Sequence, residues 1–185
     1  MRLSEPRVPR VTDPSTLEGE AAEMWPRYER DGGVPNIFAT LINHPKLMKR
    51  WTVFGNHVLY KSTLPPRDRE LLILRTGYRW QAAYEWSAHA RIGREVGLTD
   101  DEISRVAEGP EAPGWDSFDA ALLRAADELT SDAFIGDQTW EALSERYDTH
   151  QLMDVVFTVG QYTLVSMALN TLGVQLEEGM EGLPA

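Results

Sequence analysis

A chain of 185 residues with a net charge of −11 is long enough to bury a core and too acidic to favour nucleic acid or an anionic membrane as a partner. Apolar residues make up 42% and charged residues 25%, the proportions of a soluble globular protein. The absence of cysteine excludes disulfides, zinc–thiolate sites and thiol catalysis.

The first 34 residues predict an arm followed by one helix. Residues 1–14 contain three prolines and no periodic apolar pattern, so we expect an extended segment. A helix is predicted to begin after Asp13 and to run through Trp25 to the break at Gly32-Gly33. The N-terminus lacks the apolar stretch of a signal peptide, and we therefore expect a cytoplasmic protein.

Residues 35–175 predict an all-α domain, because apolar residues recur at helical spacing between proline, glycine and capping residues, with no alternating run that would indicate a strand. Residues 176–185 form a tail. The predicted helices are a short one after Pro35 through Ile42, one from Pro45 through Val58, one from Pro66 to Tyr78, one that contains Glu85 and His89 and ends near Gly97, one opened by the capping box Thr99–Glu102, and helices over 117–131, 138–147 and 150–172.

The last predicted helix, residues 150–172, is apolar on most sides, which favours a place in the core or at a subunit interface. Asp154, Gln161 and Asn170 interrupt the stretch, so we do not expect it to span a membrane. We predict a homo-oligomer that has neither a membrane nor a nucleic acid as its partner.

Glu85 and His89 are the first candidates for chemistry, because one helical turn places a carboxylate and an imidazole on the same face. The neighbours Tyr84 and Trp86 are large and aromatic, which disfavours a fully solvated face. Glu70, on the preceding helix, would come near in a helical hairpin. The alternative is a surface pair that contributes only a few tenths of a kcal/mol.

Polar side chains inside apolar helices are the candidates for substrate binding. Arg75 lies in a helix that we expect to be buried, where its charge needs a partner such as Glu70 or Glu85. Gln161 and Tyr162 would serve either as donors in a pocket or as hydrogen bonds between helices. The predicted substrate-binding residues are Tyr84, Trp86, Arg75, Gln161 and Tyr162.

Glu70, Glu85 and His89 offer three side chains that could serve as metal ligands. Their spacing is neither the Glu-x-x-His of di-iron bundles nor the His-Glu-x-x-His of zinc proteases. We predict no metal and no cofactor. Among the other histidines, His57 shares a helix face with Trp51, Phe54 and Val58, which favours packing in the core over catalysis, with a place at a pocket as the alternative.

The run Arg67-Asp68-Arg69-Glu70-Leu71, followed by Glu85-Trp86-Ser87-Ala88-His89-Ala90-Arg91, resembles the carboxymuconolactone decarboxylase family. The resemblance continues through Gly97–Ile103 and into the last helix, and covers roughly residues 35–175. It implies an alkylhydroperoxidase D-like helical bundle that assembles into a dimer, trimer or hexamer.

The family has two branches that differ at this site. The peroxidase branch has a C-x-x-C pair before the histidine, and these positions fall on Ala82 and Glu85. Both thiols are missing, so the thiol peroxidase mechanism is excluded. The decarboxylase branch carries E-x-x-x-H, which Glu85 and His89 match, and Glu70 matches its glutamate on the preceding helix.

The resemblance implies a cofactor-free lyase or isomerase that acts by acid/base chemistry on a small carboxylate or an enolisable carbonyl compound. His89 is the predicted general acid/base, Glu85 orients and charges it, and Glu70 tunes the pair or carries a second proton. The decarboxylases proper are shorter than this chain, which leaves the substrate open. A catalytically inactive oligomer of the same fold that binds a small ligand is the alternative.

Overall fold

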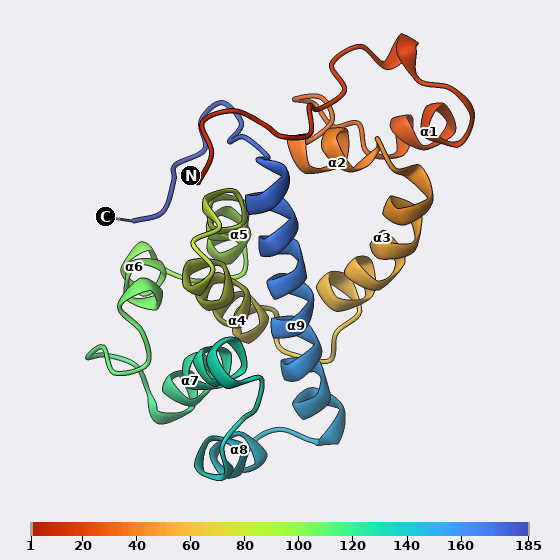
Figure 1. Cartoon of the computed structure of the whole chain (residues 1–185). Coiled ribbons are helices and arrows are strands. Elements are labelled where there is room, and N and C mark those ends of the chain that lie inside the picture. The colour runs from red at the N-terminus through yellow and green to blue at the C-terminus, as the bar shows by residue number, and fades with distance from the viewer. Residues whose placement is uncertain (1, 185) are drawn as a thin grey trace.

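The computed structural model describes residues 2–184, and in that range every regular element is helical. The predicted all-α fold is therefore confirmed. The elements are η1 (Pro14–Thr16), α1 (Gly19–Met24), η2 (Trp25–Arg27), α2 (Asn36–Leu41), α3 (Pro45–Tyr60), α4 (Pro66–Arg79), α5 (Ala83–Glu95), α6 (Asp100–Glu108), α7 (Ser117–Asp132), α8 (Asp137–Ser144) and α9 (Thr149–Leu172) (Figure 1).

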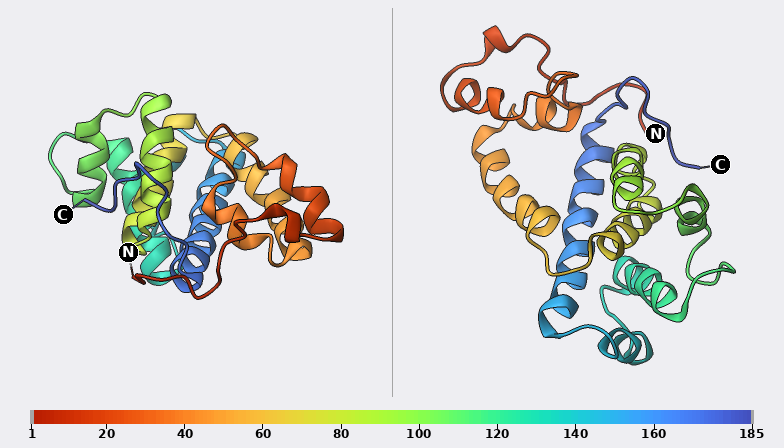
Figure 2. Two further views of the ribbon diagram at one scale, coloured as in Figure 1. Left: turned by 90° about the horizontal axis from the view of Figure 1, so that it is seen from above. Right: turned by 180° about the vertical axis from the view of Figure 1, so that it is seen from behind.

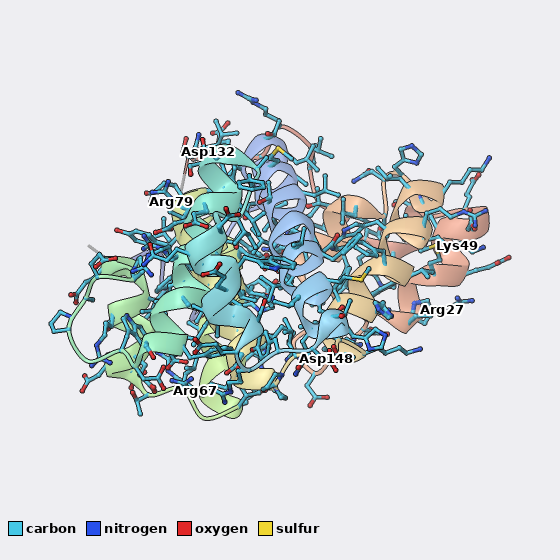
Figure 3. All side chains as sticks on the ribbon, turned by 90° about the horizontal axis from the view of Figure 1, so that it is seen from below. Arg27, Lys49, Arg67, Arg79, Asp132 and Asp148 are labelled. Atoms are coloured by element: carbon cyan, nitrogen blue, oxygen red, sulfur yellow. The ribbon has the colours of Figure 1, made fainter. Side chains whose placement is uncertain are left out.

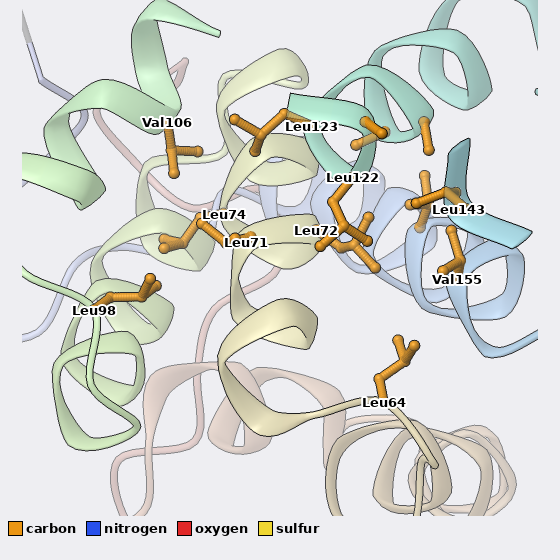
Figure 4. Packing of buried hydrophobic residues seen from close by; sticks show 14 of the residues in the cluster. Leu64, Leu71, Leu72, Leu74, Leu98, Val106, Leu122, Leu123, Leu143 and Val155 are labelled. Atoms are coloured by element: carbon orange, nitrogen blue, oxygen red, sulfur yellow. The ribbon is translucent and has the colours of Figure 1, made fainter. Parts of the chain in front are cut away.

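Helix α4 lies at the centre of the molecule and contacts α5, α6, α7 and α9. Every residue from Asp68 to Gly77 is buried, so this helix has almost no face toward solvent. By contrast, the side chains of Lys49 on α3, of Arg79 at the end of α4 and of Asp132 at the end of α7 are exposed (Figure 3). The main apolar cluster surrounds α4, and Figure 4 labels Leu64, Leu71, Leu72, Leu74, Leu98, Val106, Leu122, Leu123, Leu143 and Val155.

The charged residues of α4 are paired with neighbouring helices. Arg67 donates to Asp119 of α7 at 2.8 and 3.0 Å and to Glu102 of α6 at 2.6 Å. Arg75 donates to Asp127 of α7 at 2.7 and 2.8 Å. Both pairs are partly buried, so loss of one partner would leave the other charge poorly compensated. These pairs therefore fix how α6 and α7 lie against α4.

The N-terminal region differs from its prediction, since the expected single helix is divided into η1, α1 and η2. Gly19 has a φ of +53°, a left-handed conformation that interrupts a right-handed helix. Pro26 lacks an N–H and opens the second short turn. The arm before these turns is held by backbone hydrogen bonds from Arg7 and Val8 to the carbonyl of Leu172, at 2.9 and 3.1 Å.

Helix α3 stands apart from the main bundle. It contacts α1, α2 and α9, and Figures 1 and 2 show it diverging from α9 toward the N-terminal region. A separate small cluster, which contains Met24, Ile42 and Met48, joins α3 to the N-terminal helices. Between α3 and α9 runs a largely apolar groove of about 380 Å³, so these two helices are not packed directly along their whole length.

Helix α9 is long and apolar enough to cross a membrane by length and composition, but half of this stretch is buried inside the protein. Its other side exposes an apolar stripe that consists of Met153, Phe157, Leu164 and Met167. Together with Gly160, these residues are spaced alternately by four and three positions, the seven-residue period at which two helices pack along a seam. We propose that a second copy of the chain covers this stripe.

On this proposal, the substitution Phe157→Arg is expected to prevent self-association without unfolding the chain, because Phe157 is 52% exposed in a single chain. Sedimentation velocity at micromolar concentration would measure the change. Phe134→Arg is the matched control, since Phe134 is exposed after the end of α7 and lies off the stripe. A parent chain that sediments as a stable monomer would contradict the proposal.

Candidate active site

A tight turn between α4 and α5 sets the position of the candidate catalytic residues. The Ala82 N–H donates to the Gly77 carbonyl at 2.9 Å, and a Cβ on Gly77 would lie 3.4 Å from Cγ of Glu85, so the two helices approach closely here. Glu85 falls in the first turn of α5. The free N–H groups of a helix N-terminus favour a negative charge at such a position.

His89 lies between two carboxylates, with one at each ring nitrogen. Nδ1 is 2.6 Å from Oε2 of Glu70, and Nε2 is 3.1 Å from Oε1 of Glu85. Arg69 donates from Nε to the other oxygen of Glu70 at 3.1 Å. The three predicted catalytic residues therefore meet, and all three are buried. The surface-pair alternative does not hold for this structure.

The charge state of His89 follows from these neighbours. Burial alone would lower its pKa, but the negative charges of Glu85 and Glu70 outweigh burial and raise the pKa to about 10. The imidazole is therefore a cation at neutral pH. The ring of Tyr162 stands edge-on to it at 4.9 Å, and burial followed by the charge of Glu85 raises the pKa of the Tyr162 phenol well above its ordinary value.

A cavity of about 780 Å³ opens beside this cluster, between α3, α5, α9 and the C-terminal tail. Glu85, His89, Gln161 and Tyr162 line it. Glu70 does not line it and is fully buried behind His89. Glu85 and His89 can therefore touch a bound molecule, whereas Glu70 acts on that molecule through His89.

Two residues predicted to bind substrate lie elsewhere. Arg75 does not pair with Glu70 or Glu85, because Asp127 binds two of its nitrogens and the carbonyls of Val106 and Ala107 accept from the third at 2.9 Å. Trp86 points into the main apolar cluster, where its ring centre is 5.7 Å from that of Tyr78. Neither side chain lines the cavity.

The structure also bears on the predicted roles of Tyr84, as a substrate-binding residue, and of His57, as a core residue. Tyr84 lines the cavity, but its hydroxyl donates to Glu177 of the C-terminal tail at 2.5 Å. Burial and this carboxylate raise the pKa of Tyr84 above its ordinary value. His57 is exposed and does not pack in the core, because it lies on the solvent side of α3.

Sequence reasoning missed four residues around the site. Arg69 entered the prediction only within the run Arg67–Leu71, although it pairs with Glu70 at 3.0 Å. Trp51 and Gly55 of α3 and Glu177 of the tail line the cavity from distant parts of the chain. No spacing rule links these segments to α5. The only sequence signal was the buried pattern around Arg69, where an adjacent carboxylate is a natural partner.

No group of three or more histidine, aspartate or glutamate side chains in residues 2–184 is arranged to hold a metal ion. The Glu70–His89–Glu85 cluster joins two carboxyl groups through one imidazole ring. Its chemical capacity is to hold a buried positive charge and a carboxylate side by side at the wall of a cavity.

Comparison with known proteins finds a family model that covers the site. The model of the Carboxymuconolactone decarboxylase family matches residues 45–128, which include Glu70, Glu85 and His89. The resemblance inferred from the sequence is confirmed by this match. No curated protein is significantly similar in sequence to the chain.

Solved structures share the fold at low sequence identity. An uncharacterized peroxidase-related protein with an alkylhydroperoxidase AhpD core, from Ralstonia eutropha JMP134, is 21% identical with a TM-score of 0.81, over 94% of this chain and 93% of that one. Another peroxidase-related protein, from Silicibacter sp. TM1040, is 16% identical with a TM-score of 0.79, over 96% and 97%. The debrominase Bmp8 in complex with 2,3,4-tribromopyrrole is 13% identical with a TM-score of 0.76, over 95% and 94%.

The raised pKa of His89 predicts that its ring stays protonated from pH 6 to about pH 9. Carbon-13 NMR of labelled histidine would follow this, and Glu85→Gln should move the transition to lower pH. Since the folded pKa lies above the unfolded value of about 6.5, protonation stabilises the fold fully below about pH 6.5, and this contribution falls as pH rises toward 10. Titration of His89 near pH 6.5 would contradict the assignment.

Proposed function

We propose that this protein, which belongs to the carboxymuconolactone decarboxylase family and has an alkylhydroperoxidase D-like fold, is a cofactor-free lyase or isomerase. It would act by acid/base chemistry on a small carboxylate or enolisable carbonyl compound. The observation that carries the proposal is the ion-paired His89 between Glu70 and Glu85 at the wall of a cavity. Strongly perturbed ionisable groups at a cavity are typical of catalytic sites.

The raised pKa of His89 supports a division of roles that differs from the one expected from the sequence. An imidazolium cannot accept a proton, so His89 acts as an acid and as a fixed positive charge. Glu85, whose carboxyl group lies at the cavity beside His89, is then the base. The orienting role passes to Glu70, which holds Nδ1 and is itself held by Arg69.

In an isomerisation, Glu85 would take a proton from the carbon beside the substrate carbonyl. The electron pair of the C–H bond then forms an enolate, whose negative charge lies on oxygen near the His89 cation. Glu85 returns the proton to another carbon. In a decarboxylation, the bond to the carboxylate breaks, CO2 leaves, and its bonding electrons form the same enolate. His89 then donates a proton to carbon and becomes neutral.

The alternative is an inactive oligomer that binds a small ligand in the same cavity. The debrominase of similar fold binds 2,3,4-tribromopyrrole, which supports a small ring compound as the ligand under either proposal. The enzymatic proposal and this alternative differ only in whether the bound compound is turned over. The buried charge cluster favours catalysis, because a site that only binds has no need of a carboxylate and an imidazolium in contact.

Glu85→Gln and His89→Ala are expected to lower kcat by about 10²–10⁴-fold, the usual contribution of a general acid or base. Ultraviolet absorbance would follow turnover of 4-carboxymuconolactone first and other enolisable acids afterwards. His57→Ala is the matched control, since the side chain of His57 is exposed on α3 and does not line the cavity. Equal loss of activity and of helical circular dichroism in the two site variants would assign them a structural role instead.

Glu70→Gln tests the positioning role separately. Removal of its negative charge should lower the pKa of His89, because Glu70 is one of the two groups that raise it. We expect the alkaline limb of the kcat/KM profile to move to lower pH while the chain stays folded. An unchanged profile would show that Glu70 serves the fold and not the acid/base group.

A further inference from the structure

Helix α4 begins with four consecutive charged residues, Arg67-Asp68-Arg69-Glu70, which divide between two networks. Arg67 and Asp68 bind side chains of α6, of α7 and of the turn before α9. Arg69 and Glu70 pair with each other instead, and Glu70 continues to His89 of α5. One short run of sequence therefore supplies both a structural network and part of the candidate active site.

Arg69 lies against the oxygen of Glu70 that does not touch the imidazole. Its Nε is 3.1 Å and its Nη2 3.0 Å from Oε1 of Glu70, whereas Oε2 lies 2.6 Å from Nδ1 of His89. The side chain of Glu70 has no exposed surface, and that of Arg69 is 11% exposed. A guanidinium group keeps its charge in proteins at any ordinary pH. Arg69 is thus a permanent positive charge at the inner end of the cluster.

The other arginines near the site are engaged elsewhere. Arg75, the next arginine of α4, is bound by an aspartate of α7. Of the two arginines that line the cavity, Arg91 pairs with a glutamate of its own helix at 2.7 Å, and Arg30 donates to backbone carbonyls. Among the residues that the structure describes, Arg69 is therefore the arginine that pairs with this cluster.

The charge of Arg69 acts on the cavity wall although Arg69 itself does not line the cavity. Burial first, and then the charge of Glu85, raise the pKa of the Tyr162 phenol, and the charge of Arg69 opposes this rise. Any influence of Arg69 on a bound molecule is therefore electrostatic and passes through the groups that it touches.

We propose that Arg69 is a positioning residue of the active site, whose fixed charge holds the carboxyl group of Glu70 against Nδ1 of His89 and limits how tightly the cluster binds its protons. This inference rests on the proposed function and adds to it a residue outside the cavity. The physical reason is charge balance, because a buried cluster that loses a positive charge has uncompensated negative charge. Such a cluster binds a proton more tightly.

Carbon-13 NMR of labelled histidine in the Glu85→Gln background would test this, because that background is expected to bring the titration of His89 to lower pH. Arg69→Met, added to this background, should raise the pKa of His89 by about 1 or more, since it removes a positive charge close to the ring. Loss of a purely structural contact would lower the melting temperature without this rise.

Two further variants in the same background serve as controls. Arg69→Lys should leave the pKa of His89 close to that of the background, because the positive charge is kept. Arg79→Met removes another arginine of α4, one that pairs with Asp127 at 3.4 Å, and should not move this pKa. A pKa that stays constant or falls with Arg69→Met, or that moves equally with Arg79→Met, would overturn the proposal.

A double substitution keeps the test open if Arg69→Met alone does not fold. Arg69→Met combined with Glu70→Gln removes one charge of each sign, so the buried carboxyl group is no longer left without its cation. We expect the double variant to fold and to melt above Arg69→Met alone. Losses of melting temperature that simply add, or failure of both variants to fold, would show that the two side chains act independently and would overturn the proposal.

Turnover provides a separate readout. The alkaline limb of the kcat/KM profile should move to higher pH with Arg69→Met, the direction opposite to that expected for Glu70→Gln. The NMR measurement does not depend on turnover. A raised His89 pKa without turnover of any substrate would support the role of Arg69 in the charge balance and refute the enzymatic proposal. Turnover together with an unmoved His89 pKa would do the reverse.

Discussion

Helix α4 is buried along nearly its whole length, where a charged side chain needs a partner, and four of its charged side chains have that partner on a neighbouring element. Arg67 pairs with α6 and α7, Arg75 pairs with α7, and Asp68 accepts from Tyr147 at 2.5 Å just before α9. Glu70 is the fourth, and its partner is His89 of α5. One helix thus fixes the placement of its neighbours, and the candidate active site uses one of these structural pairs.

The charges of the site are balanced, but one of its hydrogen-bond acceptors has no aligned donor. Arg69 and the His89 cation compensate the carboxylates of Glu70 and Glu85, so the buried cluster has no net charge. Glu70 has donors at both oxygens, whereas Oε1 of Glu85 has a nearby charge but no aligned donor. Such local violations of polar satisfaction are expected where function competes with stability. The two glutamates therefore differ in role although they touch the same ring.

The sequence predicted the helices well because proline, glycine and capping residues mark most of their ends. It also predicted the shared face of Glu85 and His89, which depends only on helical spacing. The directions of Arg75 and Trp86 were wrong, since a helix buried on several sides offers each side chain more than one neighbour. Whether a residue from a distant segment, such as Glu177, reaches the site depends on how the chain ends pack. Periodicity within a helix carries no information about that packing.

The ligand cavity and the apolar groove between α3 and α9 share part of their walls, because Ile37, Trp51 and Val165 line both. Helix α3 makes few contacts with the bundle, so its distance from α9 sets the size of both spaces. A second copy that covers the α9 stripe would lie beside this groove and limit the movement of α3. Coupling between two sites is reciprocal in free energy. Assembly that holds Trp51 in place would therefore favour ligand binding, and a bound ligand would favour assembly to the same degree.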